Sequence, residues 1–186
     1  MEVYIGVMEN IKESKKRRIF KEVKDWNICI IIAVIATVLI NKFLIYKVYI
    51  PSSSMVPTLN KGDQLFVTKV YNPEKLKTGD IVVFYSREFK DTYIKRLIGC
   101  PGDNVKIEKG VVYVNGKKIN QDYVVYDDDT FSGEYNVPEG KYFFLGDNRP
   151  VSNDSRKWKN PFVDEDDIEG KAVLKVYPFK DFGLLK

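Results

Sequence analysis

Serine and lysine are the side chains in this chain of 186 residues whose types and positions could support catalysis. The chain contains no histidine, which excludes Ser-His-Asp and Cys-His catalysis and zinc sites built on histidine. A base that acts near neutral pH must then be a lysine, a carboxylate or a tyrosine. A neutral lysine can accept the proton of a serine hydroxyl, as in the Ser-Lys variants of the catalytic triad.

Three consecutive serines lie in the segment IPSSSMVPTL, residues 50–59. Pro51 and Pro57 bracket them, and proline fixes its own φ while restricting the residue before it. We therefore expect a stiff, non-helical loop. Taken alone, this segment is more typical of a polar linker than of a catalytic loop.

A lysine in the segment YIKRLI, residues 93–98, is the candidate base. Strand periodicity places Tyr93, Lys95 and Leu97 on one face, where apolar neighbours would desolvate the ammonium and lower its pKa. Moving that pKa from about 10.4 to near neutrality requires about 3 units, or roughly 4 kcal/mol. Burial can supply this much. An edge-strand lysine that reaches into water would fit the same pattern.

A polar segment, LGDNRPVSNDSR, follows a β-type run at residues 145–156. It contains two residues each of Asp, Asn, Ser and Arg. Such loops are usually turns. Asp-to-Arg pairing within the loop would instead stiffen it, and Ser152 or Ser155 could then be directed at another group.

An apolar stretch, ICIIIAVIATVLI, occupies residues 28–40. With Trp26 and residues 43–46 it reaches the roughly 20 residues that span a membrane. The basic cluster at residues 15–18 predicts that the N-terminus lies in the cytoplasm. We expect a cytoplasmic segment at 1–25, an anchor at 26–47 and an extracytoplasmic domain at 48–186. A cleaved signal peptide is the alternative, but no small-x-small cleavage site follows the stretch.

After the anchor the sequence predicts one compact, mainly antiparallel β domain. Asn115-Gly116 is a strong hairpin signal, and we expect a hairpin-containing insertion at about 104–140. Basic and acidic residues are equal in number beyond residue 48, which argues against a nucleic-acid partner. The two cysteines are too few for a disulfide framework. The expected strands are Gln64–Val70, Asp80–Tyr85, Tyr93–Ile98, Val111–Val114, Lys117–Ile119, Tyr142–Leu145 and Ala172–Tyr177.

Four segments together resemble the conserved boxes of bacterial type I signal peptidases, in the single-anchor, Gram-positive-like form. They are PSSSMVPTL, GDIVVF, YIKRLIGCPGD and GDNRPVSNDSR, in this order behind an N-terminal anchor. The resemblance extends from the anchor to about Arg156. It implies a serine–lysine endopeptidase in the bacterial cell membrane that needs no cofactor or metal. Its partners would be membrane lipid and signal-peptide-bearing preproteins emerging from the export machinery.

The resemblance also implies roles for individual residues. Ser54 matches the nucleophile and Lys95 the general base, while the Ser54 N–H and the Ser52 hydroxyl match the oxyanion hole. Ser152 matches the serine that orients the lysine. Ser53 and Pro150-Val151 depart from the usual pattern, and the latter pair bears on the placement of Ser152. The structural support of the site would be Asp147, Asn148, Arg149, Asp154 and Arg156, and the shallow pockets for small substrate side chains would be formed by Ile50, Pro51 and Ile94.

Other functions fit the sequence less well. A self-cleaving repressor with a Ser-Lys pair would need a helical DNA-binding domain, and a penicillin-binding enzyme would need Ser-x-x-Lys, which does not occur. An inactive homologue or a membrane-tethered β adaptor is the remaining alternative. Acidic clusters at Asp127–Asp129 and Asp164–Asp167 lack the spacing of a calcium loop and indicate solvated surface.

Overall fold

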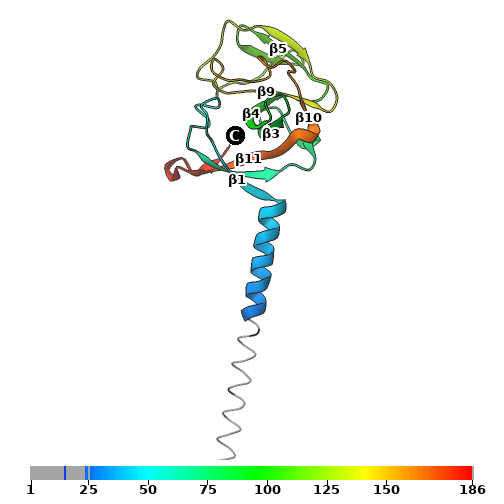
Figure 1. The fold of residues 1–186 in the computed structure, drawn as a ribbon. Coiled ribbons are helices and arrows are strands. Elements are labelled where there is room, and N and C mark those ends of the chain that lie inside the picture. Colours follow the sequence, from blue (N-terminus) through cyan, green and yellow to red (C-terminus); the bar gives the residue numbers. More distant parts are fainter. Residues whose placement is uncertain (1–14, 16–23, 25, 186) are drawn as a thin grey trace, which may run out of the picture. The chain divides into compact units, whose positions relative to one another are not determined.

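The computed structural model describes residues 15, 24 and 26–185 (Figure 1). The chain divides into two compact units, Met1–Leu44 and Ile45–Lys186. The segment expected to be cytoplasmic, residues 1–25, lies almost entirely outside the described residues.

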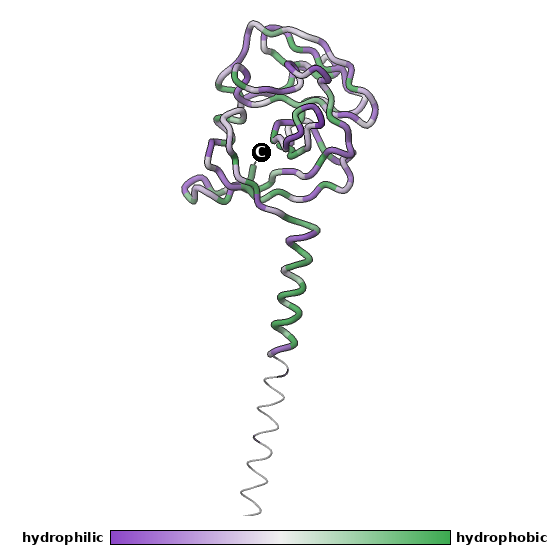
Figure 2. The backbone as a smooth tube through the Cα atoms, viewed as in Figure 1, coloured by the Kyte–Doolittle hydropathy of each residue, from purple (hydrophilic) through white to green (hydrophobic). Residues whose placement is uncertain are grey.

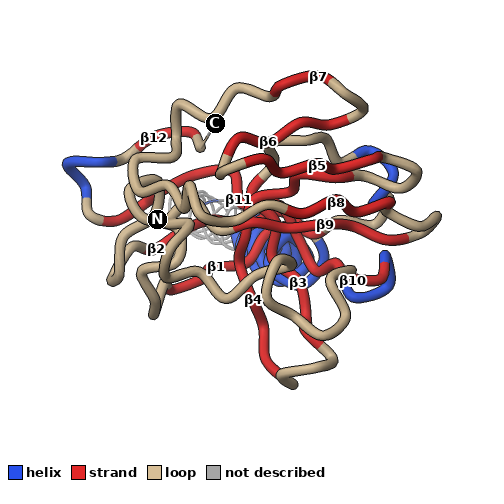
Figure 3. The backbone as a smooth tube through the Cα atoms, turned by 90° about the horizontal axis from the view of Figure 1, so that it is seen from above, coloured by secondary structure: helices blue, strands red, loops and turns tan. Residues whose placement is uncertain are grey.

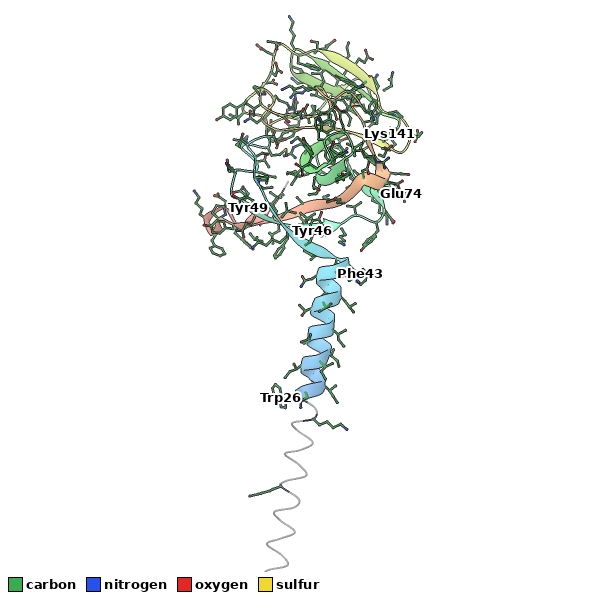
Figure 4. All side chains as sticks on the ribbon, viewed as in Figure 1. Trp26, Phe43, Tyr46, Tyr49, Glu74 and Lys141 are labelled. Atoms are coloured by element: carbon green, nitrogen blue, oxygen red, sulfur yellow. The ribbon has the colours of Figure 1, made fainter. Side chains whose placement is uncertain are left out.

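The first unit contains one apolar helix, described from Trp26 to Phe43 (Figures 2 and 4). It is long and apolar enough to cross a membrane, and its side chains are exposed all round. An isolated helix that is apolar on every face fits a membrane span. The expected single apolar helix at the N-terminus is therefore confirmed. The chain is already in a β-strand at Ile45, inside the range that the sequence assigns to the anchor.

The second unit is built on an eight-stranded antiparallel sheet, which confirms the predicted mainly β fold. Its order is β1-β2-β11-β3-β4-β9-β10, with β12 paired to β11. Short 3-10 turns at Pro73–Lys75, Glu165–Asp167 and Phe179–Asp181 connect strands. The strands are β1 (Ile45–Tyr49), β2 (Gln64–Lys69), β3 (Ile81–Ser86), β4 (Asp91–Gly99), β9 (Lys141–Leu145), β10 (Val163–Asp164), β11 (Ile168–Tyr177) and β12 (Gly183–Leu184).

A second, four-stranded antiparallel sheet is inserted between β4 and β9 (Figure 3). Its order is β7-β6-β5-β8. Asn115 and Gly116 both have positive φ, as the tight turn between β6 and β7 requires. The strands are β5 (Asn104–Glu108), β6 (Val111–Val114), β7 (Lys117–Lys118) and β8 (Gly133–Asn136).

The serine-rich loop contributes to the hydrophobic core of the large sheet. Met55 and Leu59 are buried there together with Ile50, against residues of β2, β3 and β11. Burial of large aliphatic side chains contributes about 1.5–3 kcal/mol each. The loop is thus part of the folded core, although Ser52 and Ser53 are exposed and Ser54 is half-buried.

We expect Gly170→Ala to destabilise the protein by roughly 1–3 kcal/mol, because a Cβ at this position of β11 overpacks the sheet. It would lie 2.6 Å from Val67 Cγ1 and 2.7 Å from the Thr68 carbonyl oxygen, and a backbone atom cannot move aside. Urea unfolding measures the effect. Gly183→Ala is the control, since an added Cβ there meets nothing within 4 Å. Equal midpoints for the two variants would contradict the expected clash.

Candidate active site

The loop at residues 50–63 carries Ser54 and is closed at its base by backbone hydrogen bonds. The Ile50 N–H donates to the Asp63 carbonyl at 2.9 Å, and the Gly62 N–H donates to the Ile50 carbonyl at 2.9 Å. A loop closed at its ends and packed through Met55 and Leu59 holds Ser54 at a defined position.

Ser54 meets the lysine of β4. Lys95 Nζ lies 2.7 Å from Ser54 Oγ and 3.3 Å from the carbonyl oxygen of Ile94. The lysine is only 3% exposed, so the interpretation of an edge-strand lysine in water is wrong. The Tyr93 ring, two residues earlier on the same strand, lies 5.3 Å from Nζ. The two side chains that the sequence singles out are therefore in direct contact.

Burial lowers the pKa of Lys95 from 10.5 to about 8. The carboxylates of Asp154 and Asp147 act in the opposite direction but do not cancel the desolvation. With a pKa of about 8, roughly a tenth of the lysine is uncharged at pH 7 and half at pH 8. A neutral amine in contact with a hydroxyl can accept its proton.

Asp147 organises the region between the lysine strand and the serine loop. Its carboxylate accepts two hydrogen bonds from Arg96, at 2.8 and 2.7 Å, and one from the Thr58 hydroxyl at 2.5 Å. The Tyr123 ring covers the guanidinium at 3.8 Å. Bidentate pairs fix orientation as well as charge. Sequence reasoning names Asp147 but misses its partners Arg96 and Thr58. The one available signal concerns Arg96, which follows Lys95 on the strand and therefore points to the opposite face.

Asn148 ties the polar loop at residues 146–156 directly to the serines. Its backbone N–H donates to the Ser54 carbonyl at 3.0 Å, and its side-chain amide donates to the Ser53 carbonyl at 3.2 Å. Both bonds are accepted by backbone carbonyls, so the Ser54 hydroxyl stays available to Lys95.

Asp154 holds the polar loop from within. It accepts from the Gly146 N–H at 3.0 Å and from Arg156 Nε at 2.9 Å. Arg156 also donates to the Arg149 carbonyl at 2.5 Å. Arg149 is itself buried and donates to the Gly146 carbonyl at 3.0 Å. The five residues expected to support the site, Asp147, Asn148, Arg149, Asp154 and Arg156, all lie in this network or in its contacts with the serine loop.

Ser152 is fully buried, and its hydroxyl has no hydrogen-bond partner among the described residues. It packs on Gly146, where an added Cβ would lie 2.2 Å from Ser152 Oγ and 2.6 Å from the Ser54 carbonyl oxygen. Ser152 is thus adjacent to the serine loop without a bond to Lys95. Its lysine-orienting role stays a prediction.

Ser52 lies beside the nucleophile candidate, with its Oγ 3.4 Å from Ser54 Oγ. Both side chains open onto a cavity of about 310 Å³. Residues 51–54 line one side of it and residues 91–95 of β4 the other, with Val151 and Asn153 at the margin. Of the expected pocket residues, Pro51 and Ile94 line this cavity, whereas Ile50 is buried in the core beneath it.

Some side chains of the two acidic clusters form ion pairs with arginines. Asp164 and Asp167 pair with Arg87, and Asp128 pairs with Arg156. Within the described part of the chain, no three potential metal ligands gather at one place.

Comparisons with known proteins place these residues in context. The family model described as signal peptidase, peptidase S26, matches residues 23–177. Signal peptidase IB of Staphylococcus aureus (strain COL) is 37% identical over 181 residues, covering 87% of this chain and 93% of that protein. A probable signal peptidase I-2 of Synechocystis is 37% identical over 188 residues, covering 95% of this chain and 85% of the other. The crystal structure of a signal peptidase I from Enterococcus faecalis is 34% identical, with a TM-score of 0.47, and covers 52% of this chain and 96% of that one.

Replacing Lys95 by Met should change how stability depends on pH. Between about pH 8 and 10.5 Lys95 holds more protons in the unfolded state than in the folded state, so its contribution to the free energy of unfolding rises with pH in this window. This contribution amounts to roughly 3 kcal/mol and appears as a difference between wild type and Lys95→Met that grows with pH. Urea unfolding of both proteins across this range measures it. Lys117→Met controls for the loss of a positive charge at an exposed position, and parallel curves for wild type and Lys95→Met would refute the expectation.

Proposed function

This chain belongs to the signal peptidase family, peptidase S26, and we propose that its nucleophile is Ser54 and its general base is Lys95. It is a serine endopeptidase that cleaves signal peptides from preproteins. The observation that carries the proposed pair is the 2.7 Å contact between Ser54 Oγ and a lysine that is 3% exposed.

In the first step, Ser54 Oγ attacks the carbonyl carbon of the scissile peptide bond while Lys95 Nζ accepts the hydroxyl proton. The negative charge that develops on the carbonyl oxygen is stabilised by the Ser54 backbone N–H and the Ser52 hydroxyl. Removal of one such donor typically lowers the rate about 10²–10³-fold.

The same lysine completes the cycle. As the bond between carbonyl carbon and nitrogen breaks, the Lys95 ammonium returns its proton to the departing amine, which is the new N-terminus of the mature protein. Water then gives a proton to neutral Lys95 and attacks the acyl-enzyme ester, and the ammonium reprotonates Ser54 as the signal peptide leaves with a free carboxylate. The carboxylates of Asp147 and Asp154 stabilise the transient ammonium, since both raise the Lys95 pKa.

The substrate chain is proposed to bind along β4. Residues 91–95 pair with β3 on one edge, whereas β9 pairs only with residues from Arg96 onward. An extended peptide can add to such an edge, in the way that many peptide-binding domains extend a sheet. Pro51 and Ile94, with Ile50 beneath them, would then form shallow pockets that admit only small side chains before the scissile bond.

The membrane arrangement follows from the N-terminal helix. One apolar helix fits a single-pass membrane anchor. We propose that residues 1–25 are cytoplasmic and that the domain beyond the anchor, assigned from the sequence to 26–47, is extracytoplasmic, because the basic cluster precedes the helix. The enzyme would then contact membrane lipid and meet preproteins as they leave the export machinery.

Ser54→Ala and Lys95→Met are each expected to lower cleavage of a preprotein by at least about 10³-fold, because one removes the attacking oxygen and the other its base. The measurement is the rate of appearance of the mature N-terminus, mapped by sequencing, with circular dichroism as the check on folding. Normal cleavage by either folded variant would falsify the catalytic pair and favour an adaptor role.

Ser152→Ala is expected to lower kcat at least about tenfold with KM unchanged, and to shift the acid limb of the pH–rate profile, if the hydroxyl orients Lys95 during the reaction. Stability should change little, because this hydroxyl has no hydrogen-bond partner to lose. Ser155→Ala is the matched comparison. It removes a bond from the Phe144 N–H at 2.9 Å and should lower the free energy of unfolding by about 1–3 kcal/mol. Full activity in Ser152→Ala would reduce Ser152 to a packing role.

A further inference from the structure

We propose that Asp91 is a specificity-determining residue, which makes the enzyme favour preproteins with a basic residue, and disfavour those with an acidic one, four or five positions before the cleavage site. The inference rests on the proposed function, since it takes Ser54 and Lys95 as the point of cleavage. It adds a charge preference to the size selection of the shallow pockets.

Asp91 contributes the only carboxylate among the residues that line the cavity at Ser54. The other strongly charged group there, Lys95, is buried, whereas Asp91 is exposed. A substrate side chain that lies in the outer part of the cavity therefore meets a negative charge. The positive charge of the site is confined to the buried amine.

Strand geometry sets the distance from the cut. Asp91, Tyr93 and Lys95 alternate along β4, so their side chains leave the same face. At about 3.3 Å per residue, Asp91 lies about 13 Å from Lys95. An extended substrate strand advances by the same rise. If its scissile bond lies at Lys95, the substrate residue beside Asp91 is four or five positions away from that bond.

The direction follows from the pockets for small side chains. Ile94 precedes Lys95 on β4, on the side toward Asp91, and lines the cavity together with Pro51. If they receive the residues before the cut, the chain continues from there toward Asp91, and the charge preference applies to the signal peptide rather than to the mature protein.

The Asp91 carboxylate is available to a substrate. Its Oδ1 accepts the neighbouring Thr92 N–H at 2.8 Å, and no lysine or arginine among the described residues forms an ion pair with it. Lys90 precedes Asp91 but does not line the cavity. Because an exposed charge is screened by water and salt, the expected preference is a few-fold effect that weakens with ionic strength.

Three preprotein substrates that differ only in Lys, Ala or Glu test the proposal, with the changed residue placed in turn at the fourth and fifth positions before the cut. We expect the full-length enzyme in detergent at low salt to cleave the Lys substrate about three- to fivefold better than the Glu substrate, by kcat/KM, at one of these positions. In Asp91→Asn, which can keep the bond from the Thr92 N–H, the ratio should fall below about 1.5-fold. In Asp91→Lys it should invert.

Asp129→Asn is the matched control, because Asp129 is exposed and lies outside the cavity. It should keep the wild-type ratio, and 0.5 M salt should reduce that ratio in both proteins. Equal cleavage of the three substrates by the wild type, an unchanged ratio in Asp91→Asn, or a preference at positions after the cut would each overturn the role of Asp91. Failure of the wild type to cleave the Ala substrate, or cleavage of it by Ser54→Ala, would overturn the proposed function and this inference with it.

Discussion

The contact between the Lys95 amine and the Ser54 hydroxyl constrains the whole β domain, because a lysine in water is charged and could not act as the proposed base. The demand is met by excluding water from the lysine rather than by adding a catalytic group. Desolvation lowers the pKa to about 8 even though Asp147 and Asp154 oppose it. The same carboxylates favour the charged form of Lys95, which would stabilise the ammonium that the proposed mechanism requires. Burial and the two carboxylates together keep the charged and neutral forms of Lys95 close in free energy near neutral pH.

Positioning is shared among three segments that are distant in sequence. The serine loop is anchored in the core by Met55 and Leu59, the lysine lies on a central strand, and Asn148 joins the loop that follows β9 to the serines. Arg96 leaves β4 on the face opposite Lys95 and binds Asp147. One strand therefore carries both the proposed base and the arginine that binds Asp147. The Arg96–Asp147 pair is fully buried, where desolvation makes ion pairs costly, and its role is to hold the segments around Lys95 in place.

The sequence predicts most of the longer strands and the hairpin at Asn115-Gly116, because period and turn chemistry are local properties. It misses β5, although the residues NVKIE alternate, and the two-residue strands β10 and β12. It does not predict β1, which follows the apolar helix directly and looks like its continuation, or β8, whose residues GEYN are mostly polar. The proposed catalytic pair follows from the absence of histidine and from the family resemblance. The partners Thr58 and Arg96, and the cavity position of Asp91, depend on how loops meet across the sheet. Tertiary contacts of this kind leave no local pattern in the sequence.

The inserted sheet is attached to the large sheet at two strands that pair with each other, since Gly99 of β4 lies opposite Phe143 of β9. Chain entry and exit at one place would ordinarily make such a segment replaceable, as in domain grafting. Here one stretch prevents that: the Tyr123 ring covers Arg96, and the Tyr126 carbonyl accepts the Arg149 N–H. The hairpin tip at Asn115-Gly116 bonds only within its own part of the chain, through Asp103 and Asn104, whereas the stretch from 123 to 126 covers the ionic network. A graft that omitted residues 123–126 would expose Arg96 and its partner Asp147 to water, although Ser54 and Lys95 themselves would be unchanged.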